Sequence, residues 1–302
     1  MATGCAPKEP FPPEQHYPSS VINVPFIPPR SELCGSTSIE MVASYWQTTT
    51  AYIPKLSSSE LEARTLIPAK GGTLQIEMVT ATRANGLIVY PLEPTYEALF
   101  AELSAQHPVI VLVNRSFSWH PMWHYAPVIG YDEEKRSLIA HFSDQPNERL
   151  SIATFAALWK RSGNWGLLLL PPGELPASVS SKTFLRAVYE FEKMGNSKEA
   201  ILTYQSALKR WPEDIDILFA LANAEYNASN LLEAEKYYRK LLVLHPSHPL
   251  ALNNLAILLC HSGRSDEGLK LLDTVVSDEL KIQSLVKSTR EEISRGCAQG
   301  IH

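Results

Sequence analysis

The chain has 302 residues, of which 45% are apolar and 20% charged, and its formal net charge is −5. This composition is that of a globular protein able to bury a full core, and the length suggests two domains. The modest negative charge, with no basic stripe, argues against nucleic acid as a partner, and no apolar run approaches the roughly 20 residues of a membrane span. Four cysteines are too few for a disulfide framework in a chain of this length.

The N-terminal residues 1–8 resemble the end of a bacterial lipoprotein signal, in which small residues precede an acylated cysteine, here Cys5. The apolar stretch that should come first is missing, so a lipid anchor and a chance match both stay open. With a lipid on Cys5, residues 6–23, rich in Pro, Glu and Ser, would tether the domain to a membrane. We therefore assign residues 1–20 as an N-terminal tether.

Cys34 stands at the start of a helix predicted over residues 34–47, after an extended, proline-rich segment at 21–30. The helix is indicated by apolar residues at i, i+3, i+4 and i+7, namely Ile39, Val42, Ala43 and Trp46. At a helix N-terminus the macrodipole and the N–H groups favour a thiolate, so a basic partner could lower the pKa of Cys34 below its usual value of about 8.5. Cys34 could instead be a small buried hydrophobe, as free cysteines often are.

The rest of the first domain predicts helices followed by strands. Three more helices are expected: one after the serines at 57–59, one capped by Thr73 and ended by Asn85-Gly86, and one over 96–105. Strands are expected at 87–90, 108–113, 124–131, 137–142 and 165–170. Helices that precede an antiparallel sheet are typical of an α+β domain.

Beyond a linker rich in Pro, Gly and Ser, the pattern becomes purely helical and repeats. The residues Ala200, Tyr204, Ala207 and Pro212 recur 34 positions later as Ala234, Tyr238, Leu241 and Pro246. A 34-residue period, with small residues where two helices cross and proline after the second helix, resembles the tetratricopeptide repeat. The resemblance covers about residues 182–280, and residues 281–295 are expected to form a helix that caps the last repeat.

A cysteine nucleophile needs a base, and the predicted sheet contains His120, His124 and His141. His124 opens a strand directly after an aromatic loop at 117–123. A metal site built from the three histidines is an alternative, but their spacing matches no recognised metal motif, so we expect no metal and no cofactor. Among the aromatic residues Trp119, Trp123 and Tyr125, each could line a substrate cleft or cover the end of the sheet as ordinary core.

Leu33-Cys34-Gly35 with its apolar helix, and His124-Tyr125-Ala126-Pro127-Val128-Ile129-Gly130-Tyr131-Asp132 about ninety residues later, resemble the C39-like peptidases. This papain-like group includes domains that trim double-glycine leaders from exported bacterial peptides. The resemblance covers about residues 20–170 and implies that Cys34 is the nucleophile and His124 the general base and acid. The chain also resembles the subgroup in which tetratricopeptide repeats follow this domain, often in predicted bacterial lipoproteins.

The fold class expected from these resemblances is an α+β papain-like cysteine peptidase domain followed by an all-α tetratricopeptide-repeat solenoid. The peptidase domain is expected at residues 21–172, a linker at 173–181, and about three repeats with a capping helix at 182–302.

Two positions depart from the family pattern. The family usually places Asp or Asn on the strand after the histidine strand, to fix the imidazole tautomer. Here the candidates are His141, as a neutral acceptor, and Asp144, as an anion. The family also commonly has a Gln five or six residues before the cysteine, and this window holds Pro28 and Pro29. The backbone N–H of Gly35 would remain as an oxyanion donor, and losing one donor typically costs about 10²–10³ in rate.

The sequence thus predicts a bacterial cysteine peptidase whose repeats dock a peptide or a partner protein. The alternatives are a catalytically inactive C39-like domain that serves as a binding scaffold, and acyl transfer or amide hydrolysis on a small molecule. The expected location is the cell envelope, in the periplasm and lipid-anchored if Cys5 is acylated, with the cytoplasm as the alternative.

Overall fold

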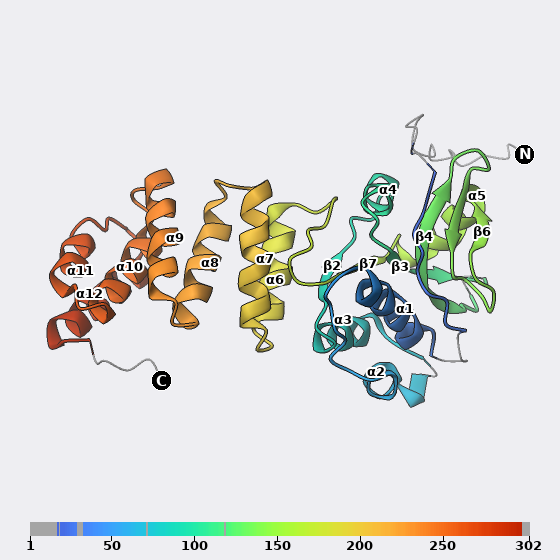
Figure 1. Ribbon diagram of the computed structural model, residues 1–302, viewed down its shortest axis with the longest axis horizontal. Helices are drawn as coiled ribbons and strands as arrows, with labels where there is room; N and C mark the ends of the chain where they lie inside the picture. The colour runs from blue at the N-terminus through green and yellow to red at the C-terminus, as the bar shows by residue number, and fades with distance from the viewer. Residues whose placement is uncertain (1–16, 18, 29–32, 71, 118, 298–302) are drawn as a thin grey trace, which may run out of the picture. The chain divides into compact units, whose positions relative to one another are not determined.

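The structure is a computed structural model that describes residues 17, 19–28, 33–70, 72–117 and 119–297. The chain divides into two units (Figure 1). The first runs to Pro171 and takes in Pro176–Ser180, and the second consists of Pro172–Leu175 and the chain from Ser181 onward. Within the described ranges, no helix is both long enough and apolar enough to cross a membrane.

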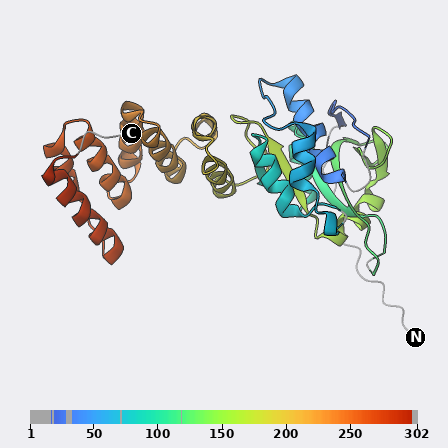
Figure 2. The same ribbon diagram turned by 90° about the horizontal axis from the view of Figure 1, so that it is seen from below.

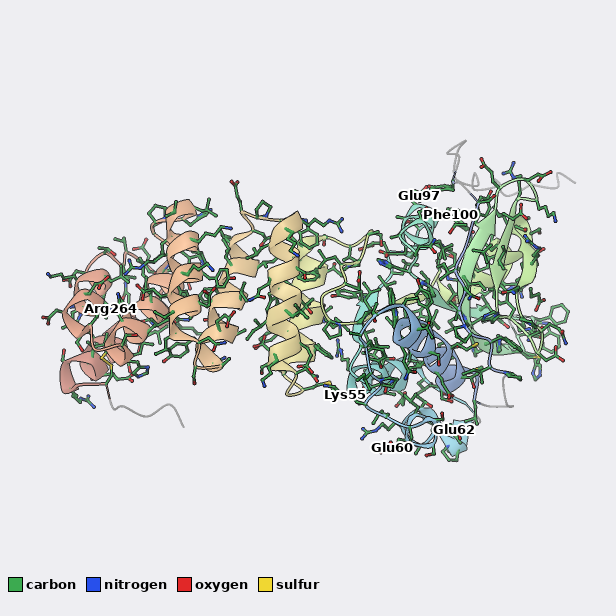
Figure 3. The ribbon with its side chains drawn as sticks, in the orientation of Figure 1. Lys55, Glu60, Glu62, Glu97, Phe100 and Arg264 are labelled. Carbon is green, nitrogen blue, oxygen red and sulfur yellow. A yellow bond between two sulfur atoms is a disulfide. The ribbon has the colours of Figure 1, made fainter. Side chains whose placement is uncertain are left out.

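The helices of the first unit begin and end largely where the sequence signals lie. They are α1 (Cys34–Thr49), α2 (Ser58–Thr65), α3 (Gln75–Ala84), α4 (Tyr96–Ser104) and α5 (Ile152–Trp159). A capping box starts α2, because the Ser57 side chain accepts from the backbone N–H of Glu60 and the Glu60 carboxylate accepts from the backbone N–H of Ser57. Glu60 is labelled in the side-chain view of Figure 3. Gly86, with φ of +88°, follows the end of α3 as predicted.

The expected cap of α3 was wrong. The N-cap residue is Leu74, and it makes no side-chain capping bond. The hydroxyl of Thr73 is buried and has no hydrogen-bond partner among the described residues. Thr73 lies instead against Gly35, at the start of α1, so its position serves the contact between two helices rather than a helix end.

The first unit contains one seven-stranded antiparallel sheet in the order β2-β7-β3-β4-β5-β6, with β1 paired to β4. Its strands are β1 (Ser20–Val21), β2 (Ile88–Pro91), β3 (Val109–Asn114), β4 (Trp123–Asp132), β5 (Ser137–Ala140), β6 (Glu148–Ser151) and β7 (Gly166–Leu170). The last strand in sequence, β7, therefore lies inside the sheet, between β2 and β3. Neither β6 nor α5 was expected, since the ERLS sequence of β6 shows little of the apolar, β-branched enrichment that marks a strand.

Apolar packing on the sheet and two side-chain hydrogen bonds, one to the sheet and one to the turn between α4 and β3, hold α1 in place. Ile39 and Val42 are fully buried on α1. The indole N–H of Trp46 donates to the carbonyl of Leu169 in β7 at 2.7 Å, and the hydroxyl of Tyr45 donates to the carbonyl of Gln106 at 2.9 Å. These contacts fix the axis of α1 and therefore the position of its first residue, Cys34.

A buried carboxylate in α4 holds part of the linker. Glu102 is fully buried and accepts from the backbone N–H of Ala177 at 3.1 Å and from the N–H and hydroxyl of Ser178 at 2.7 and 2.6 Å. His107 Nδ1 lies 2.6 Å from the same carboxylate. Burial acts to raise the pKa of Glu102, but these hydrogen bonds outweigh it and lower the pKa. On the other side of the linker, the N–H of Gly173 donates to the hydroxyl of Thr203 at 3.0 Å.

The second unit consists of consecutive helices that stack along the chain (Figure 2). They are α6 (Ser181–Glu192), α7 (Ser197–Arg210), α8 (Ile215–Asn227), α9 (Leu231–Leu244), α10 (Pro249–His261), α11 (Ser265–Leu272) and α12 (Leu280–Arg295). The repeat positions 200, 234 and 268 hold Ala, Ala and Gly, all buried. A Cβ at Gly268 would lie 2.7 Å from the carbonyl oxygen of Ala256, so the helix crossing requires a residue without one.

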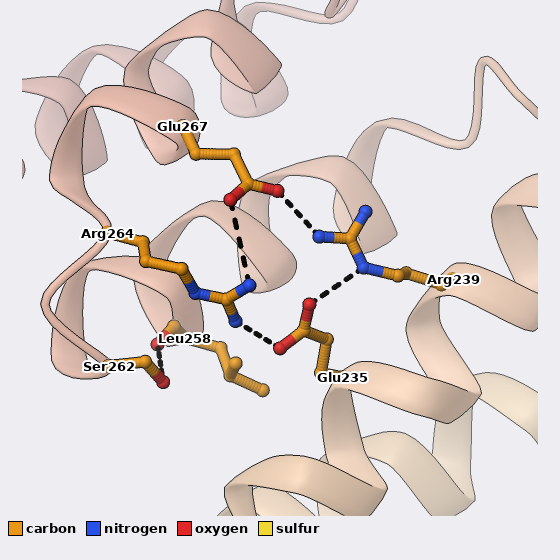
Figure 4. Close-up of polar contacts among 6 residues, drawn as sticks. All are labelled: Glu235, Arg239, Leu258, Ser262, Arg264 and Glu267. Atoms are coloured by element: carbon orange, nitrogen blue, oxygen red, sulfur yellow. Dashed lines mark hydrogen bonds and ion pairs between the residues drawn. The ribbon is translucent and has the colours of Figure 1, made fainter.

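Four charged side chains form a closed ring where α9 meets the start of α11 (Figure 4). Arg239 bonds Glu235 at 2.7 Å and Glu267 at 2.6 Å, and Arg264 contacts the same two carboxylates. The hydrogen bond from Arg264, followed by that from Arg239, lowers the pKa of Glu235 despite opposing desolvation. The ring links consecutive repeats through charge as well as through apolar packing.

A disulfide joins Cys260, in α10, to Cys297, just after α12, with the two Cα atoms 5.9 Å apart. Cys260 also belongs to a buried apolar cluster of the second unit, and nothing in the sequence marked Cys297 as its partner. The partners are 37 residues apart, and the turn of α12 back onto α10 brings them together. Within the described part of the chain, Cys34 is the one free cysteine.

Candidate active site

Cys34 is the first residue of α1, and its sulfur is surrounded by backbone N–H groups. The N–H groups of Tyr125, Cys34 and Gly35 all donate toward the sulfur. Tyr125 follows His124 in β4, so this contact places the nucleophile candidate against the strand segment that carries the base candidate. The structure therefore places Cys34 beside the neighbour of His124 in β4, whereas the imidazole itself bonds the Phe142 carbonyl.

Gly35 is required by the packing of α1 on the start of α3. A Cβ at this position would lie 2.7 Å from the hydroxyl oxygen of Thr73 and 2.9 Å from the sulfur of Met78. Contacts this short do not occur for real Cβ atoms, so only glycine allows the first turn of α1 to approach so closely. This close approach holds the backbone N–H groups beside the sulfur in position.

The pKa of the Cys34 thiol is raised above its ordinary value, mainly by burial. The three backbone N–H donors act in the opposite direction but do not outweigh the loss of water around the sulfur. The N–H groups at the helix N-terminus act in the expected direction, but burial outweighs them, so the net pKa is raised. In the resting site the sulfur is a thiol, and it needs a base at the moment of attack.

His124 is half-buried at the start of β4, and its imidazole donates to the backbone carbonyl of Phe142. The same carbonyl accepts from Arg115 Nη1 at 3.2 Å. Burial, and then the positive charge of Arg115, lower the pKa of His124 to about 4, although the bond to the carbonyl acts in the other direction. At neutral pH the imidazole is thus uncharged and able to accept a proton.

His141 and Asp144, the two candidates for the residue that orients His124, take no part in this contact with the Phe142 carbonyl. His141 is buried, with Nε2 at 3.1 Å from the carbonyl oxygen of Val24 and Nδ1 accepting from the N–H of Asn147 at 3.2 Å. Both of its ring nitrogens are thus engaged by backbone. Asp144 is exposed. Sequence reasoning missed the Phe142 carbonyl because every residue has a carbonyl, so no residue type could have marked it.

The three candidates for the substrate cleft, Trp119, Trp123 and Tyr125, differ in how far their side chains are exposed. Tyr125 is only 4% exposed, and its hydroxyl donates to the carbonyl of Thr73 at 3.3 Å. Trp119 and Trp123 are 81% and 49% exposed. Two further large apolar side chains of the same loop, Phe117 and Met122, are also exposed, and the sequence interpretation did not single them out.

The candidate oxyanion donors are the backbone N–H groups of Cys34 and Gly35, in the first turn of α1. In the window where the family commonly has Gln, Pro28 is exposed, and Pro29 lies outside the described residues. Cys5, the candidate for lipid attachment, also lies outside them.

The three histidines considered for a metal have different surroundings, since His120 is exposed in the loop and His141 is bonded to backbone. Over the described residues, one group of side chains has metal-ligand spacing: His261, Glu292 and Cys297, with ligand atoms within 4.8 Å of one another. Because Cys297 is in the disulfide, it offers no thiolate to a metal.

Models of two known families match parts of the chain. The model of the Peptidase_C39 like family matches residues 21–166, and the tetratricopeptide-repeat model matches residues 185–249 and 219–280. Residues 21–166 are a C39-like peptidase domain, and tetratricopeptide repeats follow it. The fold class expected from the sequence is thus confirmed.

Individual relatives are distant. A solved structure described as a C39-like peptidase from Bacillus anthracis has a TM-score of 0.41 and 16% identity, and the match covers 51% of this chain and 98% of that one. The cellulose synthase operon protein C of Pseudomonas fluorescens (strain SBW25) is 36% identical over 84 residues. This match covers 28% of the chain but only 7% of that much longer relative.

Proposed function

We propose that the C39-like domain is a cysteine peptidase in which Cys34 is the nucleophile and His124 the general base and acid. The observation that carries the proposal is the contact of the Cys34 sulfur with the backbone N–H of Tyr125, the residue after His124. An uncharged imidazole and a protonated thiol, as His124 and Cys34 have here, are the charge states from which a general base activates a nucleophile.

In this mechanism His124 takes the thiol proton while the sulfur attacks the carbonyl carbon of the scissile peptide bond. His124 then gives that proton to the leaving amine as the C–N bond breaks, which leaves a thioester on Cys34. Water, deprotonated by His124, hydrolyses the thioester and restores the thiol. The Phe142 carbonyl acts as a positioning group that fixes the tautomer and orientation of the imidazole, a task that a carboxylate performs in many triads.

The oxyanion formed in each attack is assigned to the backbone N–H groups of Cys34 and Gly35. A helix N-terminus presents such donors without reorganisation. Pro28 and Pro29 stand six and five residues before Cys34, where the family commonly has glutamine. This oxyanion hole therefore has fewer donors than the family pattern provides. We therefore expect modest turnover.

The tetratricopeptide repeats are assigned the docking of a peptide or partner protein, which would raise the local concentration of substrate at Cys34. The proposed location is the bacterial cell envelope. The Cys260–Cys297 disulfide supports it, because structural disulfides persist in oxidising compartments and are rare in the cytosol.

The test is cleavage of a complex peptide mixture, followed by mass spectrometry of the products, with wild type, Cys34→Ala and His124→Ala. Wild type should generate new termini that both variants lack. Asp144→Asn serves as the matched control, because Asp144 is exposed and has no role in the proposed chemistry. Equal cleavage by wild type and Cys34→Ala would refute the mechanism.

The second candidate function is a catalytically inactive binding scaffold. Two observations favour it: the raised pKa of Cys34, and a backbone carbonyl rather than a carboxylate behind His124. In that case no variant changes the products of the peptide mixture, and peptides bind equally well to wild type and to Cys34→Ala.

A further inference from the structure

The loop between β3 and β4 exposes four large apolar side chains at one place in the chain. Their exposed fractions are 64% for Phe117, 81% for Trp119, 58% for Met122 and 49% for Trp123. Isolated exposed apolar residues are common, but a contiguous group of this size marks a site of interaction. We refer to these four residues as the apolar loop.

The apolar loop is held in shape by polar contacts below its tip. The Asn114 side-chain oxygen accepts from the N–H groups of Ser116 and Met122 at 2.9 and 3.0 Å. Arg161 Nη1 donates to the carbonyls of Asn114 and Ser116 at 3.2 and 2.5 Å, and the N–H of Arg115 donates to the carbonyl of Met122 at 2.9 Å. The base of the loop is therefore preorganised, which reduces the entropy cost of binding.

Two aromatic rings at the tip form a flat surface. The rings of Phe117 and Trp119 are stacked, with centroids 5.6 Å apart and planes inclined by 11°. In that arrangement each ring supports the other while both side chains stay largely exposed, and the His120 ring lies beside Trp119 with centroids 6.0 Å apart. Flat aromatic faces favour large apolar or aromatic side chains as partners.

The loop is continuous with the candidate active site at both of its ends. The chain enters it at Arg115, whose guanidinium bonds the Phe142 carbonyl, and leaves it at His124, whose imidazole bonds the same carbonyl. Trp123 and Tyr125 lie on the same face of β4, because side chains alternate along a strand. The Tyr125 phenol is close enough to Cys34 to be influenced by its charge.

We propose that the apolar loop binds a large apolar or aromatic side chain of the substrate, close to the scissile bond. This inference rests on the proposed peptidase function and adds the class of substrate: a peptide segment with Phe, Trp, Tyr, Leu or Met beside the bond attacked by Cys34. The loop acts through binding rather than through chemistry.

The experiment measures protection of Cys34 in the full chain from iodoacetamide, followed at that residue by mass spectrometry, so that it requires no turnover. The probes are two capped pentapeptides that have glycine at the four outer positions. One has Phe at the central position and the other has Ala there. The Phe peptide should slow alkylation of Cys34 at concentrations at which the Ala peptide has no effect. The double variant Phe117→Ser, Trp119→Ser should require at least about tenfold more Phe peptide for equal protection.

The matched control is Ile53→Ser, because Ile53 is 77% exposed and follows the opposite end of α1 from Cys34. It should leave protection unchanged. Because all three substituted side chains are exposed, the variants should keep the wild-type melting temperature.

Equal protection by the two peptides, or unchanged protection in the double variant, would overturn the inference. A second result would also overturn it. If wild type but not the double variant bound phosphatidylcholine–phosphatidylglycerol vesicles, and the Phe peptide gave no selective protection, the loop would contact lipid rather than substrate. Selective protection without cleavage of any peptide would support the loop as a binding site while refuting the peptidase. The two proposals can thus fail separately.

Discussion

At the scale of single residues, the candidate pair differs from a thiolate–imidazolium pair in its charge state. Burial raises the pKa of Cys34, and burial together with Arg115 lowers the pKa of His124 to about 4. Both shifts favour the uncharged form, so the proton stays on sulfur until a substrate arrives. The first turn of α1 supplies donors near the sulfur, but in this site their effect is smaller than that of desolvation.

We expect the rate of Cys34 alkylation by iodoacetamide to be low at pH 7 and to rise with a midpoint above the usual thiol value of about 8.5. The midpoint is expected to be high because the pKa of Cys34 is raised. Only the thiolate reacts, and its fraction grows as the pH approaches and passes that pKa. The measurement is the pH dependence of alkylation at Cys34, resolved from Cys5 by peptide mass spectrometry. Urea-unfolded protein is the control, and a midpoint below 7 in folded protein would contradict the burial argument.

Arg115 offers a test of the His124 surroundings. Replacing it in Arg115→Gln removes a positive charge near the imidazole, so the pKa of His124 should rise from about 4 toward its ordinary value. The acid limb of any peptidase activity should move to higher pH by the same amount, because the base works only when it is uncharged.

Histidine ring signals in an NMR pH titration measure the shift, with Arg149→Gln as the control, because Arg149 pairs with Asp132 and does not influence His124. An unchanged His124 pKa in Arg115→Gln would mean that burial alone sets the value.

At the scale of elements, the contact of α1 with α3 depends on one glycine. Gly35→Ala would place a methyl group against Thr73 and Met78 at less than normal contact distance. We expect a loss of about 1–3 kcal/mol in the free energy of unfolding, as for overpacked sites. Urea unfolding measures it, with Gly72→Ala as the control, because a Cβ at Gly72 would meet nothing within 4 Å. Equal stability of the two variants would show that α3 can shift aside.

The sequence predicted those elements whose signals are local. The helix after Cys34 followed from apolar periodicity, and β3 from a continuous run of β-branched residues. The start of α2 followed from the serines at 57–59. The repeats followed from a 34-residue period, which reflects how helices cross. Each of these signals lies within one segment of chain.

Features that depend on distant segments were missed. The position of β7 inside the sheet, the pairing of Cys260 with Cys297 and the Phe142 carbonyl behind His124 all arise from packing of elements far apart in sequence. The net rise in the pKa of Cys34 was not predicted for the same reason. A helix N-terminus is visible in the sequence, but the degree of burial around the sulfur is not.

At the scale of the whole molecule, the disulfide fixes the C-terminal helix to the last repeat. Removing a cross-link that spans 37 residues should cost about 4 kcal/mol by the chain-entropy relation. We expect Cys260→Ser, Cys297→Ser to lower the stability of the repeats and to speed hydrogen exchange in α12. The C39-like domain, which the cross-link does not touch, is the internal control. Unchanged exchange in α12 would show that apolar packing on α10 suffices to hold it.

The interleaved linker has a consequence for anyone who wishes to separate the two units. The family match ends at residue 166, and a cut after Pro171 looks natural, yet such a fragment would lack Ala177 and Ser178. Glu102 would then lose three of its donors and remain a fully buried carboxylate beside His107 alone, which is costly for any buried charge. The smallest self-sufficient peptidase fragment therefore extends to Ser180, because its folding boundary lies beyond its evolutionary one.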